Sequence, residues 1–344
     1  MQKLAKAPYI ALNALPDLKK LLKKTCNSNK LTLMIKTHIT DEVLLEHLAS
    51  LKEDKREIFL IADGQARVYA ASCTAMVNQM RANHRLGLLE SYVLAQGYVA
   101  GALLSATVKG NDRIQLNIEC GGPIKGLNIE AWACGAVRGY LMANPIQLEK
   151  PLTTLDTSLL YGPGFLSISK ILEGAKTPFT GQIMLEHGNL AEDLAEYYRQ
   201  SEQTPTLFYI SLDYDHEGRI TGAGGIFIQA LPGCSDEVLE KLQEKSAHLP
   251  NLARFIADGG DVKDYIEENF AEYGVEHLQK SILGFSCPCR KESFEDYLAT
   301  LPENEKKAIM DGEFPLQLEC FNCGTIYSFE KEEIEDLFAR GGSR

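Results

Sequence analysis

Four cysteines gather near the end of this 344-residue chain, and their spacing indicates metal binding. Cys287 and Cys289 form a C-x-C pair, thirty residues follow, and Cys320 and Cys323 form a C-x-x-C pair. Two close pairs of thiolates are the arrangement in which two turns hold one tetrahedral metal ion. Soft sulfur ligands favour zinc, copper(I) or iron–sulfur clusters, and a closed four-thiolate shell in a reducing compartment is most often zinc. We therefore expect one zinc ion bound by Cys287, Cys289, Cys320 and Cys323.

This zinc site has a structural and a functional interpretation. A tail of roughly 60 residues buries too little apolar surface to fold alone, so metal binding, on the order of 10 to 16 kcal/mol, supplies its folding free energy. Zinc also holds cysteines as thiolates, which are the species that peroxide and hypochlorous acid attack. Cysteines two or three positions apart can approach closely enough to form a disulfide. The spacing alone leaves open whether the tail is a static zinc module or a redox switch.

The overall composition is that of a folded, acidic protein. Apolar residues make up 45% and charged residues 24% of the chain, which excludes a wholly disordered, collagenous or disulfide-scaffold protein. Lys and Arg total 35 against 47 Asp and Glu, and the formal net charge of −12 disfavours a general nucleic-acid binder. At roughly 150 residues per domain, the length suggests two domains, with a third only as a small appendage.

The other cysteines and the apolar runs bear on compartment and membrane. Nine cysteines, an odd total with only four clustered, indicate a reducing compartment rather than a secreted disulfide framework. The start of the chain lacks an apolar stretch of signal-peptide length. The longest uncharged run, Ser91–Val108, is interrupted by polar and glycine residues, so we expect a buried core helix rather than a membrane span. No Gly-rich segment continues into a phosphate loop and no catalytic nucleophile emerges, so we expect no enzyme.

Hydrophobic periodicity before the cysteine cluster indicates an α+β domain. Alternation around Ile58–Leu60 and Arg67–Ala70 predicts two opening strands, and a long helix is expected over Ala75–Thr107. Strict alternation predicts another strand at Arg113–Glu119, ending at a Gly-Gly-Pro turn. Further strands are expected at 165–168, 181–185, 207–213 and 225–229, with a helix at 190–201. The pattern predicts a largely antiparallel sheet domain with helices.

The segment between this domain and the cysteine tail has a helical pattern. Ser235 and Asp261 are suitable N-caps for two amphipathic helices, which Pro250 and a Gly-Gly pair interrupt. Short isolated helices are marginal in water, so this segment is expected to fold mainly by lying on another surface. We interpret it as a helical linker.

The two ends of the chain differ in charge. Residues 1–30 hold seven Lys and one acid, a net of +6, whereas residues 285–344 hold seven basic and thirteen acidic side chains, a net of −6. Leucines at helical spacing over Leu15–Lys24 predict a basic amphipathic helix, docked either on the chain's own main domain or on a membrane or partner. The expected domains are an N-terminal extension (1–56), a core (57–233), the linker (234–284) and a small C-terminal zinc-binding domain (285–344).

The chain resembles the heat shock protein 33 family of redox-regulated, zinc-binding, ATP-independent holdase chaperones. Members carry C-x-C and C-x-x-C pairs at the C-terminus of an α+β domain, and the resemblance covers about residues 57–335. Its further motifs are Leu103-Leu104, Gly121-Gly122-Pro123-Ile124, Val137-Arg138-Gly139-Tyr140, Gly162-x-Gly164-x-Leu166, Thr180-Gly181-Gln182, Asp193-Leu194-Ala195-x-Tyr197, Ser201-Glu202-Gln203-x-Pro205, Ala223-Gly224-Gly225 and Leu231-Pro232.

The resemblance implies that the four cysteines form a redox switch. The reduced, zinc-bound form would be inactive. Oxidation to Cys287–Cys289 and Cys320–Cys323 disulfides would release zinc, unfold the linker and expose a surface that binds unfolded client proteins. The resemblance also implies a cytoplasmic protein without enzymatic activity, a homodimer in the oxidised state, and no nucleic-acid or membrane partner.

Three features depart from the family pattern. Residues 1–56 are an extension that the family core lacks, and we expect deletion of residues 1–50 to leave zinc content and oxidative activation intact. The segment Arg290–Ser293 keeps Glu292 but not the usual serine and two arginines. Pro288 stiffens the C-x-C pair, because proline fixes its own φ and restricts Cys287 before it. We therefore expect the C-x-x-C disulfide to form first.

Two other classes of protein compete with the chaperone interpretation. One is a zinc-ribbon regulatory or RNA-binding protein that recognises its partner whatever the redox state, and the acidic tail argues against RNA. The other is a thiol oxidoreductase, which needs a dithiol on a thioredoxin-like unit, whereas both pairs lie in an isolated tail.

Overall fold

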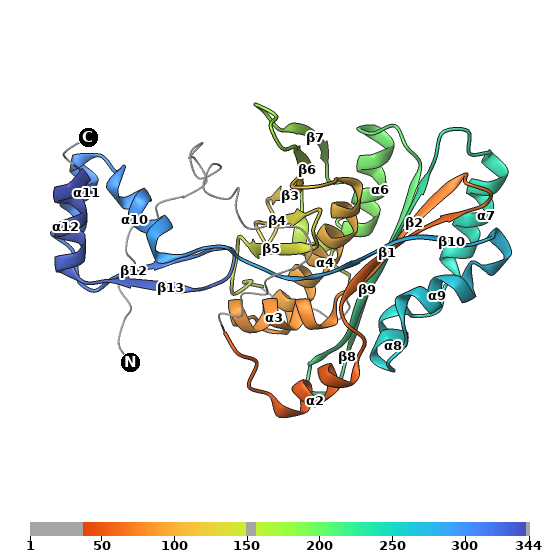
Figure 1. Ribbon diagram of the computed structural model, residues 1–344, viewed down its shortest axis with the longest axis horizontal. Helices are drawn as coiled ribbons and strands as arrows, with labels where there is room; N and C mark the ends of the chain where they lie inside the picture. Colours follow the sequence, from red (N-terminus) through yellow and green to blue (C-terminus); the bar gives the residue numbers. More distant parts are fainter. Residues whose placement is uncertain (1–36, 149–155, 342–344) are drawn as a thin grey trace. The chain divides into compact units, whose positions relative to one another are not determined.

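The computed structural model describes residues 37–148 and 156–341, which divide into two compact units (Figure 1). The larger unit takes the described residues up to Cys287 together with Gln317–Ser328. The smaller unit takes Pro288–Leu316 and the described residues from Phe329 onward. The basic helix expected over Leu15–Lys24 lies outside the described residues.

The first sheet of the larger unit is antiparallel and has the strand order β10-β1-β2-β9-β8. The two strands predicted to open the domain are β1 and β2, which are paired as neighbours. The strands of this sheet are β1 (Lys55–Ile61), β2 (Ala66–Ser72), β8 (Thr206–Tyr214), β9 (Ile220–Ala230) and β10 (Glu276–Ile282).

The second sheet has the order β11-β5-β4-β3-β6-β7 and is antiparallel except for the β11–β5 pair. The alternation at Arg113–Glu119 is β3, whose apolar residues point inward and whose polar residues stay partly exposed. Its strands are β3 (Arg113–Cys120), β4 (Gly126–Trp132), β5 (Ala136–Leu141), β6 (Gly164–Ile171), β7 (Phe179–Met184) and β11 (Gly284–Phe285). No sequence pattern predicted β4, β5, β10 or β11.

The long helix expected over Ala75–Thr107 is broken in the structure. It consists of α3 (Thr74–His84), α4 (Leu88–Leu104) and a 3₁₀ turn, η3 (Ser105–Thr107). The break falls at Arg85, whose backbone is left-handed with φ 52°, and the chain restarts at the N-cap Gly87. A left-handed residue ends a helix because its carbonyl no longer points along the axis, so the single-helix expectation was wrong.

Helix α4 is the central core helix, as the uncharged run Ser91–Val108 predicted. Its side chains are buried almost throughout, and it packs on strands of both sheets. An added Cβ at Gly225 of β9 would come within 2.7 Å of Val99, so glycine allows α4 to approach the first sheet closely. Among the described helices, none is long and apolar enough to cross a bilayer.

The linker helices cover the other face of the first sheet (Figure 1). Ser235 and Asp261 cap α7 and α9 as predicted, each accepting a bond from a backbone N–H. The end of the linker is not helical, because residues from Glu276 pair with β1 as the edge strand β10. The helical elements of the linker are α7 (Asp236–Ala247), α8 (Leu252–Ala257), α9 (Val262–Asn269) and η4 (Ala271–Tyr273). These results confirm an α+β fold with largely antiparallel sheets.

The linker and the first sheet share one hydrophobic cluster. Its sheet residues are Phe59, Ile61, Ala66, Val68, Ala70, Ile226 and Ile228. Its linker residues are Leu242, Leu252, Ile256, Val262, Tyr265, Ile266 and Phe270. Since every one of these side chains is at most 4% exposed, the linker is held by burial of apolar surface.

The smaller unit is a helical tail with a modest core. Its helices are α10 (Lys291–Ala299), α11 (Glu303–Met310) and α12 (Lys331–Gly341), and α12 packs on both others. Lys291 pairs with Glu333 at 2.7 Å and lies over the ring of Phe329. The buried apolar side chains here are Phe294, Leu298, Leu301, Phe329 and Ile334. So small a core supports the expectation that a metal must contribute to folding the tail.

The described part of the extension, residues 37–54, lies on the core. Helix α2 (Glu42–Ser50) is N-capped by Asp41, and Leu44 is its buried residue. Asp41 pairs with Arg219 at 2.7 Å, which lowers the pKa of that carboxyl. His47 Nε2 lies 2.7 Å from the carbonyl oxygen of Thr221. This contact joins the described part of the extension to the core through an acid and an arginine, whereas the basic residues 1–30 lie outside the described residues.

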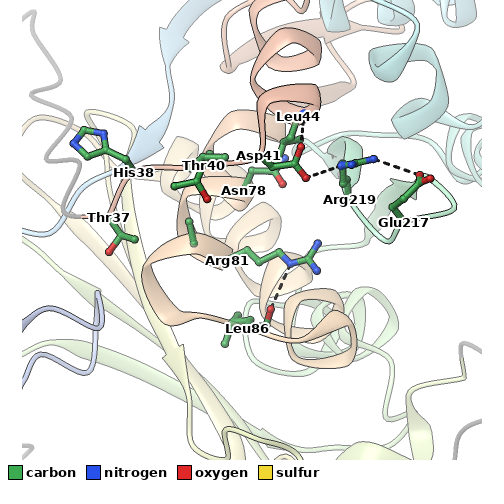
Figure 2. Close-up of a pocket in the computed structure, with 12 residues that line it drawn as sticks. Thr37, His38, Thr40, Asp41, Leu44, Asn78, Arg81, Leu86, Glu217 and Arg219 are labelled. Carbon is green, nitrogen blue, oxygen red and sulfur yellow. Dashed lines mark hydrogen bonds and ion pairs between the residues drawn. The ribbon is translucent and has the colours of Figure 1, made fainter.

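A cavity of about 480 Å³ follows the seam between this segment, α3 and the β8–β9 hairpin. Figure 2 shows Arg219 between Asp41 and Glu217, with Arg81 directed to the backbone carbonyl of Leu86. The charged groups that line the cavity thus pair with one another or with backbone. They fasten the extension to the core.

Candidate metal centre

Cys287 is positioned by a short strand that follows the linker. In β11, Gly284 and Phe285 pair in parallel with Ala136 and Val137 of β5. The ladder continues one residue further, where the Ser286 amide donates to the Val137 carbonyl at 3.1 Å. Cys287 comes next along the chain and is fully buried. The edge of the second sheet therefore fixes where this sulfur lies.

Cys320 and Cys323 lie in the turn between β12 (Leu316–Glu319) and β13 (Ile326–Phe329). The amides of Cys323 and Gly324 donate to the Cys320 carbonyl at 3.1 and 2.7 Å, and the Cys320 amide donates to the Thr325 carbonyl at 2.9 Å. Gly324 has φ 64°, and a Cβ there would lie 2.3 Å from the Asn83 carbonyl oxygen. The turn therefore depends on glycine for both its conformation and its close approach to α3.

The four cysteine sulfurs converge. Those of Cys287, Cys289, Cys320 and Cys323 all lie within 4.8 Å of one another, and three of the residues are buried. The Cys287 and Cys320 sulfurs are 3.8 Å apart. A tetrahedron with zinc–sulfur bonds of about 2.3 Å has edges of about 3.8 Å, whereas a disulfide bond is about 2.05 Å long. The sulfur arrangement therefore fits a metal ion held by four thiolates.

Core residues on α3 surround the C-x-x-C turn. Asn83 Nδ2 donates to the Cys323 carbonyl at 3.1 Å. Burial lowers the pKa of the neighbouring His84 to about 4, so its imidazole is neutral at pH 7. Phe321 packs against Tyr140 of β5, with ring centroids 5.7 Å apart. The turn is thus seated on α3 and β5.

A buried ion pair lies next to Cys287. Arg138 Nη1 is 3.6 Å from the Cys287 sulfur, and its Nε and Nη2 donate to Glu130 Oε2 of β4 at 2.9 and 2.5 Å. Burial alone lowers the pKa of Arg138, but the Glu130 carboxylate and the Cys287 sulfur more than offset this, so the pKa is raised. Arg138 is therefore a full cation beside the sulfur cluster.

A second group of buried charges holds the linker. Lys55 Nζ lies 2.5 Å from Asp261, the N-cap of α9, and 3.3 Å from Glu57. Glu57 lies 2.7 Å from His277 Nε2 of β10. Lys55 and Glu57 are nearly inaccessible in their side chains, at 7% and 1% exposed. These contacts, which we call the linker latch, join β1 to both halves of the linker.

The structure brings together all four cysteines singled out in the sequence. Sequence reasoning missed their neighbours, Arg138 and Asn83, and the linker latch. Arg138 was noted only within the Val137–Tyr140 motif, without a role. A signal was present at residues 54–57, Asp-Lys-Arg-Glu, which are four consecutive charged residues at the start of a strand. All four are buried, which in a folded protein requires specific partners.

The two-sheet core, the helical segment packed on one sheet and the C-terminal four-cysteine centre define an α+β chaperone of the Hsp33 type. The model of the Hsp33 protein family matches residues 54–330, and the chain belongs to this family.

Individual relatives agree with this assignment. The 33 kDa chaperonin of Desulforamulus reducens is 31% identical over 280 residues, covering 81% of this chain and 95% of the relative. That of Lachnoclostridium phytofermentans is 32% identical over 281 residues, covering 81% and 96%. The crystal structure of the 33 kDa chaperonin of Thermotoga maritima has a TM-score of 0.76 at 27% identity and covers 85% of this chain and 100% of its own. Family membership supports a chaperone function.

Proposed function

We propose that this protein is a redox-regulated, ATP-independent holdase. Residues 285–344 act as the sensor, 234–284 as the linker, 57–233 as the client-binding core and 1–56 as an accessory extension. In the reduced form the sensor binds one zinc ion and the chaperone is inactive. The observation that carries the proposal is the placement of Cys287, which directly follows a linker whose apolar face covers the first sheet.

We assign the ligands as Cys287, Cys289, Cys320 and Cys323. Bound zinc keeps the four sulfurs as thiolates and supplies folding free energy to the tail. The proposed disulfides are Cys287–Cys289 and Cys320–Cys323. Because this chemistry requires reduced thiols at rest, we place the protein in the cytoplasm.

Hydrogen peroxide is the oxidant that we propose for forming each disulfide. One thiolate attacks a peroxide oxygen, so that a sulfur–oxygen bond forms, the oxygen–oxygen bond breaks and hydroxide leaves. The second thiolate of the pair attacks that sulfur, forming the disulfide and displacing a second hydroxide. Two protons from solvent convert the hydroxides to water. Each pair loses two electrons to one peroxide, and its sulfurs cease to be metal ligands.

Loss of the metal centre then acts on the linker. Without the centre, β11 is held to β5 by only a short ladder, and the linker loses its C-terminal anchor. The linker helices are 12, 6 and 8 residues long, too short to persist away from the sheet. Their release exposes apolar side chains on both the linker and the first sheet, which is the surface we propose for unfolded clients.

The partners we propose are unfolded client proteins and, in the oxidised state, a second copy of the chain. Nucleic acid and membranes are not proposed as partners, because the net charge is −12. We also propose no catalytic activity. The net negative charge favours client binding over a zinc-ribbon RNA-binding function, because an acidic protein repels nucleic acid.

A light-scattering assay tests the proposal. Reduced and oxidised protein are added separately to a thermally unfolding client, and zinc is measured in both. We expect one zinc per reduced chain, little zinc after oxidation, and suppression of aggregation only by the oxidised form. A Cys320→Ser, Cys323→Ser variant is expected to lose the zinc, whereas Cys120→Ser, outside the cluster, serves as the matched control. Equal suppression by reduced and oxidised wild type would contradict a redox-regulated holdase.

A further inference from the structure

Arg138 is a charged side chain of the core that contacts the Cys287 sulfur. Its guanidinium is 3.6 Å from the Cys287 sulfur, and only 8% of the side chain is exposed. The Nε and Nη2 groups of Arg138 donate to Glu130. The Arg138 guanidinium also lies over the Trp132 ring, 5.2 Å from the centroid. The carboxylate and the ring leave the guanidinium little freedom to turn away from Cys287.

A cation fixed beside a thiolate has two physical effects. It stabilises the charge on the sulfur through a charge-assisted hydrogen bond, and it orients that sulfur toward the metal. It also withdraws electron density, so the sulfur attacks an electrophilic oxidant more slowly. Partners that hold metal ligands in this way typically change metal affinity by about 10-fold to 100-fold.

We propose that Arg138 is a positioning residue of the metal centre, which holds Cys287 as a ligand and slows its oxidation. The inference rests on the proposed function in one respect, that the four cysteines bind zinc. Arg138 lies on β5, and its pair with Glu130 on the neighbouring strand β4 fixes the guanidinium against the second sheet.

The same arrangement lets the core survive when the centre opens. A disulfide sulfur carries no charge, so oxidation removes the anionic partner on one side of Arg138. The Glu130 carboxylate, 2.5 Å from Arg138 in this structure, would still neutralise the cation. Arg138 therefore does not become an unpaired buried charge, which would destabilise the sheet.

The test compares Arg138→Met with Arg113→Met in the full chain. Arg113 lies over the same Trp132 ring, 5.8 Å from its centroid, but is bonded to neither Cys287 nor Glu130 in the described residues, so it controls for loss of a stacked arginine. We expect Arg138→Met to bind zinc about 10-fold more weakly and to release it several-fold faster under peroxide. Alkylation mapping is expected to show faster modification of Cys287. Arg113→Met is expected to behave as wild type in all three measurements.

Equal zinc affinity, release rate and Cys287 alkylation in Arg138→Met and wild type would overturn the proposal. If Arg138→Met does not fold, Arg138→Lys and Glu130→Gln provide the same comparison. Arg138→Lys keeps the charge but loses the planar set of donors, and Glu130→Gln weakens the contact that orients the guanidinium. Both variants are expected to release zinc faster than wild type. Unchanged release rates in both would refute the positioning role of Arg138. Wild-type protein without zinc would refute the proposed function as well, whereas normal zinc with unchanged rates would refute the role of Arg138 alone.

Discussion

At the scale of single residues, Asp54 couples the stability of the core to pH. Its carboxylate accepts the Met76 amide at 2.7 Å at the start of α3, yet burial raises its pKa to about 7. An unfolded Asp titrates near about 3.9. The folded state thus binds this proton more tightly, and the resulting stabilisation is complete below about pH 4 and is lost as the pH rises through 7.

Asp54→Asn is expected to reduce this pH dependence, because asparagine also caps helices but carries no titrating proton. Between pH 5 and pH 8, the free energy of unfolding of wild type is expected to fall relative to that of the variant by on the order of 2 kcal/mol. Urea unfolding followed by the fluorescence of the single tryptophan, Trp132, measures this at each pH. Parallel pH profiles for the two proteins would show that Asp54 does not titrate in this range.

We expect Pro288 to control the order in which the two proposed disulfides form. Its ring restricts the turn that brings Cys287 and Cys289 together, whereas Phe321 and Asn322 impose no such restraint between the other pair. We expect peroxide to close Cys320–Cys323 first, and Pro288→Ala to narrow the interval between the two bonds. Peptide mapping after timed thiol trapping gives the order. Appearance of the C-x-C bond first in wild type would refute the argument from Pro288.

At the scale of elements, the linker latch sets how firmly the linker is seated. Asp261→Asn keeps the N-cap of α9 but removes the charge opposite Lys55. We expect it to weaken docking of the linker by about 1 to 2 kcal/mol, because Lys55 keeps Glu57 as a partner. Amide exchange over residues 234–283 is therefore expected to be about 5-fold to 30-fold faster in the reduced protein, with zinc retained.

Lys263→Met provides the control for this element. Lys263 pairs with Glu267 on the same helix, but both side chains are about two-fifths exposed, so the pair contributes little. The amide exchange of Lys263→Met over residues 234–283 is expected to match that of wild type. Unchanged exchange in Asp261→Asn would show that the apolar contacts alone seat the linker.

The sequence predicted elements best where a single local signal determines them. Alternation identified β3, and the caps Ser235 and Asp261 gave the starts of two linker helices. The break at Arg85 was missed because the residue that takes the left-handed conformation there is an arginine, not the glycine or asparagine that usually marks a helix end. Strand β11 could not be predicted, because two residues carry no periodicity and pair with β5 almost 150 positions away.

The same distinction applies to the candidate site. The four cysteines could be identified because the spacing of metal ligands is visible in the sequence itself. Arg138 and Glu130 approach Cys287 only through the register of β4, β5 and β11, so their role needed the structure.

At the scale of the whole molecule, the extension is expected to be dispensable for the switch. Deleting residues 1–50 removes the Asp41–Arg219 pair, the His47 contact and the buried Leu44. None of these touches the cysteines or the linker latch. We expect a melting temperature a few degrees lower, with one zinc per reduced chain and normal oxidative activation. A folded truncation that no longer responds to peroxide would assign the extension a regulatory role.

The linker ends in two edge strands, β10 on the first sheet and β11 on the second. When they leave, β1 and β5 become the edges, and each presents a row of backbone amides and carbonyls without partners. Such edges pair with any extended chain through main-chain hydrogen bonds, regardless of its side chains. The activated protein would therefore offer clients a template for strand addition beside an apolar surface. Recognition through the backbone, which every polypeptide shares, would let such a protein hold clients of unrelated sequence.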